Sequence, residues 1–193
     1  MENFDETTLK KLQNLISPSR YAHSLRVAAV AGELARIYGA PIKKAKLAGL
    51  LHDCGKSTSN NILLNRVLEF GIVMDEVELI QVGLTHGQVS ARLAMRDFGV
   101  QDEDILAAIC YHTTGREGMS LLEKIVYLAD YLEPQRNFPG LDELRELAKE
   151  NLTAALVQAM DLTLIHIIER GLVIHPRTVA ARNWALIERQ AGR

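Results

Sequence analysis

The amino-acid sequence predicts an all-α protein. Apolar side chains recur at spacings of three and four residues along nearly the whole chain, which is the periodicity of helices that bury one face. No run of alternating β-branched residues is long enough to predict a strand. The chain has 193 residues, of which 48% are hydrophobic, and this is enough to bury one sizeable core without staples. We therefore expect one helical domain.

Capping residues and glycines set the expected helix ends in the first half of the chain. Ser19 is the expected N-cap of a long helix, and Gly39 is its expected stop. Pro41 suits the first turn of the next helix because its ring fixes φ near the helical value. The expected elements are, in order, helices over 19–38 and 41–52, a polar break over Ser57–Asn61, and helices over 62–71, 75–82 and 87–98. A further helix, capped by Asp102, is expected to run through Cys110.

The second half predicts four more helices and one longer loop. Ser120, with Glu123 three residues later, forms a capping box for a helix to about Leu132. Pro134–Gly140 contains two prolines and a glycine, and it is the only candidate domain boundary. Helices over 141–149, 152–170 and 176–190 follow. They are too few for a separate core, and we expect Trp184 to anchor the last of them.

Composition and charge exclude several classes of protein. The net charge is -2 and the 22 Lys and Arg residues are scattered, which argues against a surface that coats nucleic acid. The two cysteines, Cys54 and Cys110, fit a reducing cytosol better than an oxidising compartment. The first residues are acidic and polar, unlike a secretory signal, and apolar stretches such as Leu47–Leu51 are far shorter than a membrane span. We expect a cytoplasmic protein that binds no membrane.

An adjacent histidine and aspartate, His52 and Asp53, end an apolar helix in the string LLHDCGK. Imidazole nitrogen and carboxylate oxygen are ligands suited to iron, manganese or zinc. Adjacent residues on a regular helix point about 100° apart, so the pair can act together only at a helix end or between two ions. An HD dipeptide alone is therefore unspecific evidence for a metal site.

Other histidines and aspartates occur at positions where a purely structural role is an alternative to binding metal. Asp130 lies within the apolar helix IVYLADYLEP, where a carboxylate is costly to bury without a metal or a cation. Its ordinary interpretation is an ion pair with Arg136 or Lys124. His86, beside a helix start, and His112, at a helix end, are each by themselves more typical of surface or core histidines.

The ordered set of these residues resembles the HD superfamily of metal-dependent phosphohydrolases. The set is His23, His52, Asp53, His86, His112 and Asp130. The surrounding strings RYAHSLRVA, LLHDCGK, THGQVSA, HTTGREGMSLLEKIVYLADYLEPQR and FPGLDELR are similar to the bacterial YqeK family within it. The resemblance implies an all-helical HD fold with the metal site between central helices. It assigns residues 1–193 to a single HD domain, with a motif-bearing core over about 20–145 and a helical extension over about 146–193.

The resemblance also implies an activity and a cofactor. Members of this family are symmetrical dinucleoside tetraphosphatases, which cleave diadenosine tetraphosphate into two ADP with a water activated by two metals, usually iron. Manganese, cobalt and zinc suit the same ligands. His23, His52, Asp53 and Asp130 would hold the first metal, His86 and His112 the second, and Asp53 would bridge the two.

Substrate contacts are expected around these ligands. Asp53 is expected to orient the attacking water, and Lys56, one helical turn later, to meet a phosphate oxygen. Arg20 and Arg136 are phosphate-clamp candidates because a guanidinium matches phosphate oxygens bidentately. The small polar loop Thr113, Thr114 and Gly115 is a further candidate for contacts with phosphate. A solvated surface lysine that contacts no substrate is an equally good interpretation of Lys56.

Two other functions remain open from the sequence. The first is a different nucleotide phosphohydrolase, such as a 5'-nucleotidase, for which the single-metal set without His86 and His112 would suffice. The second is a non-catalytic HD module that binds a nucleotide and signals to a partner. The exposed apolar positions of the later helices also leave room for a homodimer. His166, His175, Cys54 and the acidic run Asp142–Glu146 are interpreted as structural residues.

Overall fold

The computed structural model describes residues 4–56 and 59–191, and every regular element in these ranges is helical. The helices are α1 Glu6–Leu15, α2 Pro18–Tyr38, α3 Ile42–Leu51, α4 Asn60–Glu69, α5 Glu76–Ile80, η1 Val82–Thr85 (a 3₁₀ turn), α6 His86–Phe98, α7 Glu103–Tyr111, α8 Leu121–Leu132, α9 Leu141–Glu150, α10 Leu152–Glu169 and α11 Pro176–Ala191. The predicted all-α fold is confirmed. Of the predicted polar break, residues 57–58 lie outside the described residues.

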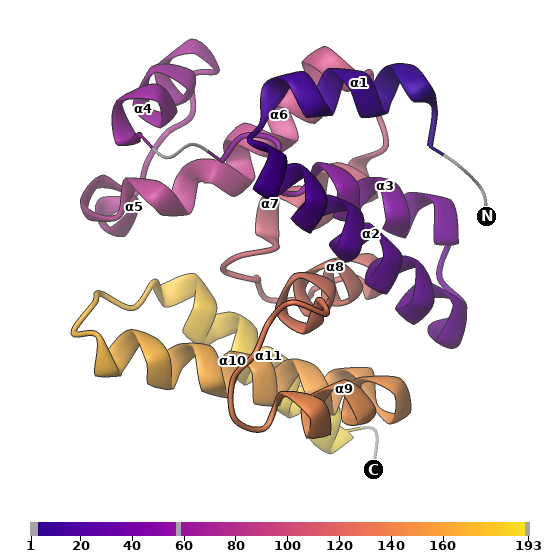
Figure 1. Cartoon of the computed structure of the whole chain (residues 1–193). Helices are drawn as coiled ribbons and strands as arrows, with labels where there is room; N and C mark the ends of the chain where they lie inside the picture. The colour runs from indigo at the N-terminus through magenta and orange to yellow at the C-terminus, as the bar shows by residue number, and fades with distance from the viewer. Residues whose placement is uncertain (1–3, 57–58, 192–193) are drawn as a thin grey trace.

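Helix α8 is the central element of the fold. It packs against α2, α3 and α7 on one side and against α9 and α10 on the other (Figure 1). Four of its apolar side chains, Ile125, Val126, Leu128 and Ala129, have no exposed surface. Because both sides of α8 are covered, the carboxylate of Asp130 in its last turn lies inside the molecule, facing α2 and α3.

The start of the chain differs from the sequence prediction. Helix α2 begins at Pro18, with Ser17 as N-cap, rather than at Ser19. Proline has no amide hydrogen and its fixed φ suits the first helical position, so the capping residue is the one before it. Helix α1 was not predicted. Asp5 caps it by accepting hydrogen bonds from the amides of Thr7 and Thr8, and its Leu12 is fully buried.

Other helix boundaries follow the predicted chemistry. Asp102 caps α7, and the Ser120–Glu123 capping box opens α8 as expected. The helix expected over 75–82 is shorter, because α5 ends at Ile80 and a separate 3₁₀ turn, η1, leads into α6. Helix α6 therefore starts at His86 itself rather than at the following glycine.

Two glycines allow backbones to approach each other closely near the centre of the fold. A Cβ atom at Gly87 would clash with the carbonyl oxygen of Cys110, so only glycine lets the start of α6 lie against the end of α7. A Cβ atom at Gly55 would lie 2.7 Å from the amide nitrogen of Ser90 in α6. The amide of Gly55 instead donates to the Ser90 hydroxyl at 2.9 Å. These contacts bring the ends of α3, α6 and α7 together.

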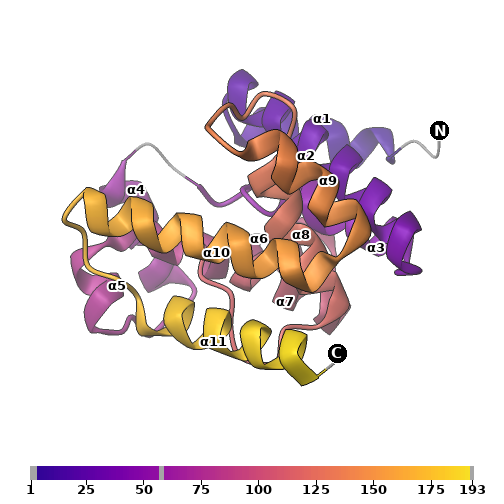
Figure 2. The same ribbon diagram turned by 90° about the horizontal axis from the view of Figure 1, so that it is seen from below.

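Helices α10 and α11 form an antiparallel hairpin that covers the lower side of the core (Figures 1 and 2). The loop before α11 is fastened to the core: His175 Nε2 lies 2.9 Å from Asp75 Oδ2, and the Gln81 amide donates to the Val173 carbonyl at 2.6 Å. His175 Nδ1 also accepts a hydrogen bond from the amide of Arg177 at 3.1 Å, which agrees with its interpretation as a structural residue.

The prediction that Trp184 anchors the last helix is wrong. Trp184 is 46% exposed, and the buried positions of α11 are the small residues Thr178, Ala181 and Ala185. Small side chains let α11 lie close to α10, and the large indole is left on the outer face. Helix α10 is long and apolar enough to cross a membrane by length and composition alone, although a third of that stretch is buried inside the protein.

We predict that Gly87→Ala lowers the free energy of unfolding by roughly 1–3 kcal/mol, since the added methyl group must push α6 away from α7. Urea denaturation measures this change. Gly83→Ala is the matched control, because nothing lies within 4 Å of a Cβ atom at Gly83. Equal stabilities of the two variants would contradict the close approach of the two backbones.

Candidate metal centre

Six side chains converge between the central helices. They are the six that the sequence singled out: His23 of α2, His52 and Asp53 at the end of α3, His86 at the start of α6, His112 at the end of α7 and Asp130 of α8. Centroids of neighbouring imidazole rings lie 4.9–5.2 Å apart. Four of the six are at most 4% exposed. The side chains of His23 and Asp130 are 15% and 20% exposed, so they mark the open side of the cluster.

Three of the histidines are held in the same way at helix ends. The Nδ1 atoms donate to the backbone carbonyl three residues earlier, at 2.7 Å for His52 to Gly49, 2.5 Å for His86 to Gly83 and 2.7 Å for His112 to Ile109. The Gly49 and Ile109 carbonyls lie in the last turns of α3 and α7, where helical partners run out. The Gly83 carbonyl lies in η1 and also accepts the amide of His86. Because a carbonyl only accepts, each Nδ1 carries the hydrogen and each Nε2 keeps its lone pair.

The free lone pairs face one another. His86 Nε2 lies 3.0 Å from His112 Nε2, and His52 Nε2 lies 3.3 Å from His23 Nε2. Asp53 Oδ1 lies 3.2 Å from His86 Nε2 and 3.5 Å from His112 Nε2. This buried oxygen has no hydrogen-bond partner among the described residues. Electron pairs packed in this way repel unless a cation or a shared proton lies between them. The donor set therefore fits a metal ion.

The two oxygens of Asp53 face different parts of the cluster. The first group consists of His23, His52 and Asp130, whose ligand atoms lie close enough to share one ion. We call His86 and His112, whose Nε2 atoms lie 3.0 Å apart, the second group; the ligand atoms of His52, Asp53 and His112 also lie close enough to share one ion. Asp53 Oδ1 faces the second group, while Oδ2 lies 3.7 Å from His52 Nε2 of the first. Asp53 is thus the carboxylate common to both groups.

His23 has a different partner, which sequence reasoning missed. It lies near the start of α2, and its Nδ1 is 3.5 Å from Glu133 Oε1 at the end of α8, while its Nε2 is 3.1 Å from Asp130 Oδ1. Glu133 is 4% exposed and accepts a 2.6 Å hydrogen bond from Arg26 Nε. The sequence signal is spacing: Arg26 follows His23 by three residues, and Glu133 follows Asp130 by three.

Three cationic side chains lie at the carboxylates of the cluster. Arg20 Nη1 is 2.5 Å and Lys56 Nζ is 3.2 Å from Asp53 Oδ2, and Arg136 Nη2 is 3.0 Å from Asp130 Oδ1. Their side chains are 26–47% exposed, so they lie at the rim. The ion pair of Asp130 with Arg136, which the sequence offered as the alternative to a metal, is therefore present.

Lys124, the other ion-pair partner considered for Asp130, instead binds Glu188 of α11 at 2.5 Å.

The three residues of the expected phosphate loop are placed differently. The Thr113 hydroxyl lies 3.1 Å from His86 Nε2 and 3.0 Å from His112 Nε2, so it touches the second group. Thr114 is buried and donates to the Gly115 carbonyl, and the space beside Gly115 is taken by Met160. No contact joins Thr114 or Gly115 to the cluster among the described residues, and the phosphate contacts expected of all three residues stay predictions.

Burial and neighbouring charges keep the cluster in the form that binds cations. Burial lowers the pKa of His52 to about 4 and also lowers that of His86, so both rings are neutral at neutral pH. Burial alone would raise the pKa of Asp53 and Asp130. The surrounding histidines outweigh that effect and hold both carboxyls below their usual range.

Cys54 does not contribute to the cluster. Its thiol is fully buried and donates to the Ser90 carbonyl, and burial raises its pKa to about 12, so it stays protonated. This agrees with its interpretation as a packing residue.

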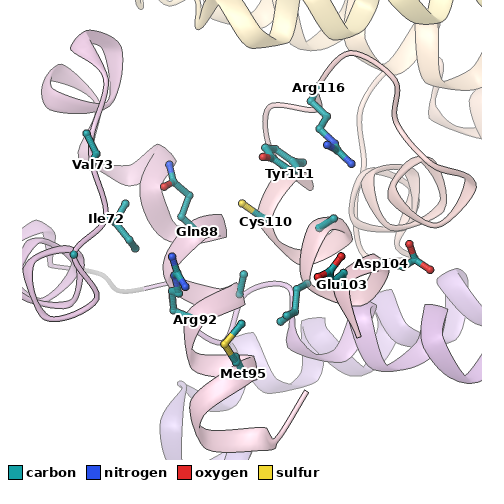
Figure 3. A pocket seen from close by; sticks show the side chains of 14 residues that line it. Ile72, Val73, Gln88, Arg92, Met95, Glu103, Asp104, Cys110, Tyr111 and Arg116 are labelled. Atoms are coloured by element: carbon teal, nitrogen blue, oxygen red, sulfur yellow. The ribbon is translucent and has the colours of Figure 1, made fainter. Parts of the chain in front are cut away.

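A cavity of about 700 Å³ lies on the outer faces of α6 and α7, lined in part by Gln88, Cys110 and Tyr111 (Figure 3). Gln88 and Cys110 each stand two residues from a cluster histidine, and residues two apart on a helix point about 200° apart. The cavity and the cluster therefore lie on opposite sides of the α6–α7 pair, and we do not place a substrate of the cluster there.

Comparison with known proteins gives consistent matches. The family model described as "HD domain" matches residues 20–135. The chain is 39% identical to the "Bis(5'-nucleosyl)-tetraphosphatase, symmetrical" of Bacillus subtilis, over 93% of this chain and 96% of that protein. A protein of the same name from Halalkalibacterium halodurans is 37% identical, over 91% of this chain and 93% of the relative.

A solved structure is also similar over nearly the whole chain. It is the crystal structure of a predicted HD superfamily hydrolase, described as involved in NAD metabolism, from Clostridium acetobutylicum. The TM-score is 0.91 at 39% identity, covering 96% of this chain and 98% of that one.

We predict that Glu133→Gln weakens binding of manganese or ferrous iron roughly ten- to a hundredfold, because His23 loses the carboxylate that orients its ring. Isothermal titration of the chelator-treated chain measures this affinity. Glu146→Gln, on the exposed pair with Lys149, is the control and should bind as the wild type does. Unchanged affinity in Glu133→Gln would show that Glu133 does not position His23.

We predict that the metal-free chain loses stability as pH falls from 7 to 5. The unfolded chain takes up protons on histidine below about pH 6.5, whereas folded His52 resists protonation down to about pH 4. The stabilisation is thus present above pH 6.5 and decreases towards pH 4, with His52 alone contributing on the order of 2 kcal/mol between pH 7 and 5. Urea denaturation across this range measures it, and an unchanged midpoint would contradict the buried neutral imidazole.

Proposed function

The chain belongs to the HD domain family of metal-dependent phosphohydrolases, and from that membership we propose that it cleaves dinucleoside tetraphosphates symmetrically. The relatives that share 37–39% identity over more than nine tenths of the chain bear the name of that activity. The proposed substrate is diadenosine tetraphosphate and the proposed products are two molecules of ADP.

The observation that carries the two-metal form of this proposal is the division of the cluster around Asp53. A closed tetrahedral site needs four ligands, and this cluster offers six residues. We propose that His23, His52, Asp53 and Asp130 hold one divalent ion, and that His86, His112 and Asp53 hold a second. A single-metal nucleotidase would have no use for the buried pair of His86 and His112.

The chemistry needs a nucleophile and neutralised phosphate charge. Two bound divalent ions would lower the pKa of a water molecule towards neutrality and offset charge on the phosphate oxygens. Asp53 stays ionised because of its histidine neighbours, so it can bridge the ions and accept a hydrogen bond from the attacking water. The Thr113 hydroxyl, beside His86 and His112, can hold the same water or a phosphate oxygen.

The rim cations suit a tetraphosphate chain. Arg20, Lys56 and Arg136 lie around the open side of the cluster and carry the positive charge that a polyphosphate requires. Water adds at an inner phosphorus: a new P–O bond forms there, the central P–O–P bond breaks, and each half leaves as a nucleoside diphosphate.

Several further features belong to this proposal. Iron is the proposed metal, and manganese, cobalt and zinc suit the same nitrogen and oxygen ligands. We propose that residues 1–193 form a single HD domain that acts in the cytoplasm, with a nucleotide as its binding partner and no nucleic acid. The scattered charges of the chain and its net charge of -2 support the last point.

The test is product analysis of the chain purified without chelator and supplied anaerobically with ferrous iron or manganese. Diadenosine tetraphosphate is assayed beside AMP and GDP, and we predict that ADP is the product from the first. We predict that His86→Ala or His112→Ala lowers the rate roughly a hundredfold or more, because charge stabilisation at the phosphate is lost. His166→Ala, on an exposed position of α10, should leave the rate unchanged.

Three outcomes would contradict the proposal. Release of AMP and ATP would show asymmetric cleavage, and turnover of AMP alone would indicate a 5'-nucleotidase. Nucleotide binding without any turnover, at full metal content, would indicate a non-catalytic signalling module.

A further inference from the structure

The end of α8 and the loop after it carry two side chains that face the metal cluster. Glu133, directly after the last residue of α8, lies 3.5 Å from His23 Nδ1. Arg136 lies three residues further on, and its Nη2 is 3.0 Å from Asp130 Oδ1. Because Arg136 stands in the loop between α8 and α9, the position of its side chain depends on what holds the backbone of this loop.

The loop has few contacts of its own at Arg136. The side chains of residues 134–137 are exposed, so packing does not hold this stretch. The amide of Arg136 donates to the Glu133 carbonyl at 2.9 Å, which shapes the turn. Further along the chain, the ring of Phe138 packs against Tyr131 with centroids 5.3 Å apart. The backbone between these two points needs a further partner.

Arg145 of α9 supplies this partner. Its Nε donates to the Leu132 carbonyl at 3.1 Å. Its Nη2 donates to the carbonyl of Glu133 at 3.1 Å and to that of Arg136 at 3.4 Å. Its Nη1 donates to Asp142 Oδ1 at 2.8 Å. One guanidinium group therefore spans the backbone from the last residue of α8 to Arg136.

The chemistry of arginine suits this position. The last carbonyls of a helix lack amide partners and carry partial negative charge, which a cation stabilises. The planar guanidinium places N–H donors in several fixed directions, whereas lysine offers one compact charge. Helix α9 holds Arg145 in place, because Leu141, Leu144 and Ala148 of the same helix are buried. The core thus fixes the loop through this one side chain.

We propose that Arg145 is a positioning residue for substrate binding, which holds the loop after α8 so that the Arg136 guanidinium stays at the open side of the metal cluster. Arg136 is then held at both ends, by Arg145 at its carbonyl and by Asp130 at its side chain. A polyphosphate that arrives there does not have to order the loop, which lowers the cost of binding. This inference rests on the proposed function, because it takes a nucleotide phosphate as the ligand of Arg136.

Arg145 acts through Arg136 and does not serve as a phosphate contact itself. All three of its nitrogens donate within the chain, and a phosphate would have to displace these bonds. Its side chain is 28% exposed, against 47% for Arg136. Its ion-pair partner Asp142 is 91% exposed, and a pair of this kind contributes little. The bonds to the carbonyls are therefore the ones that position the loop.

The test is isothermal titration of the metal-loaded chain with ADP, the proposed product, in the presence of manganese. We expect Arg136→Ala and Arg145→Gln each to weaken ADP binding roughly tenfold, because one charge-assisted contact with phosphate is lost. The double variant should bind within about twofold of Arg136→Ala, since Arg145 has no effect once Arg136 is absent. The control Asp142→Asn removes the ion pair but keeps the carbonyl bonds, and it should bind ADP as the wild type does.

Hydrolysis of diadenosine tetraphosphate separates positioning from a loss of stability. For Arg145→Gln we expect KM to rise roughly tenfold and kcat to stay within about threefold of the wild type, because the metal ligands are unchanged. A purely structural role would lower the fraction of folded enzyme, so kcat would fall and KM would stay the same. If circular dichroism shows that Arg145→Gln does not fold, Arg145→Lys replaces it, with the same results expected because the charge stays and the planar group is lost.

Two results would overturn the proposal. Wild-type affinity for ADP in Arg145→Gln would show that Arg145 does not position a phosphate contact. A loss of roughly a hundredfold in the double variant would show that the two arginines act independently. A wild-type chain that binds ADP but does not cleave diadenosine tetraphosphate would contradict the proposed function instead, and the ADP titrations would still decide the role of Arg145.

Discussion

The structure depends on one repeated hydrogen bond, from a histidine Nδ1 to the carbonyl three residues earlier at a helix end. It occurs at His52, His86 and His112. Each bond fixes which ring nitrogen keeps its lone pair, because a carbonyl can only accept. Three rings held in this way point their Nε2 atoms at a common centre. The Oδ1 atom of Asp53, which has no hydrogen-bond partner within the described part of the chain, then completes a donor set that fits a cation.

The helical scaffold serves to bring these helix ends together. Gly87 and Gly55 allow α6 to contact both the end of α7 and the turn after α3, because no Cβ atom fits at either position. Helix α8, covered on both sides, carries Asp130 and Glu133 to the same place. The energetic cost of crowding carboxylates and imidazoles away from water is offset by these hydrogen bonds and by the rim cations. The same features make the cluster suited to holding metal and phosphate together.

Much of the fold and of the cluster could be predicted from the sequence, and the misses have physical causes. Helical periodicity and capping chemistry predicted most helices, because both are local properties. The sequence does not predict α1 because its composition is mostly polar. The start of α2 differs from the predicted one because a proline at the first helical position makes Ser17 the cap. The exposure of Trp184 and the role of Glu133 depend on which helices pack together, and spacing along the chain does not determine that.

The most direct test of this account is anomalous X-ray diffraction from crystals of the chain loaded with manganese or iron. The account predicts two peaks of anomalous density, one among His23, His52 and Asp130 and one between His86 and His112, with Asp53 contacting both. A single peak in the first group, with His86 and His112 still free, would contradict the claim that Asp53 joins two metal sites.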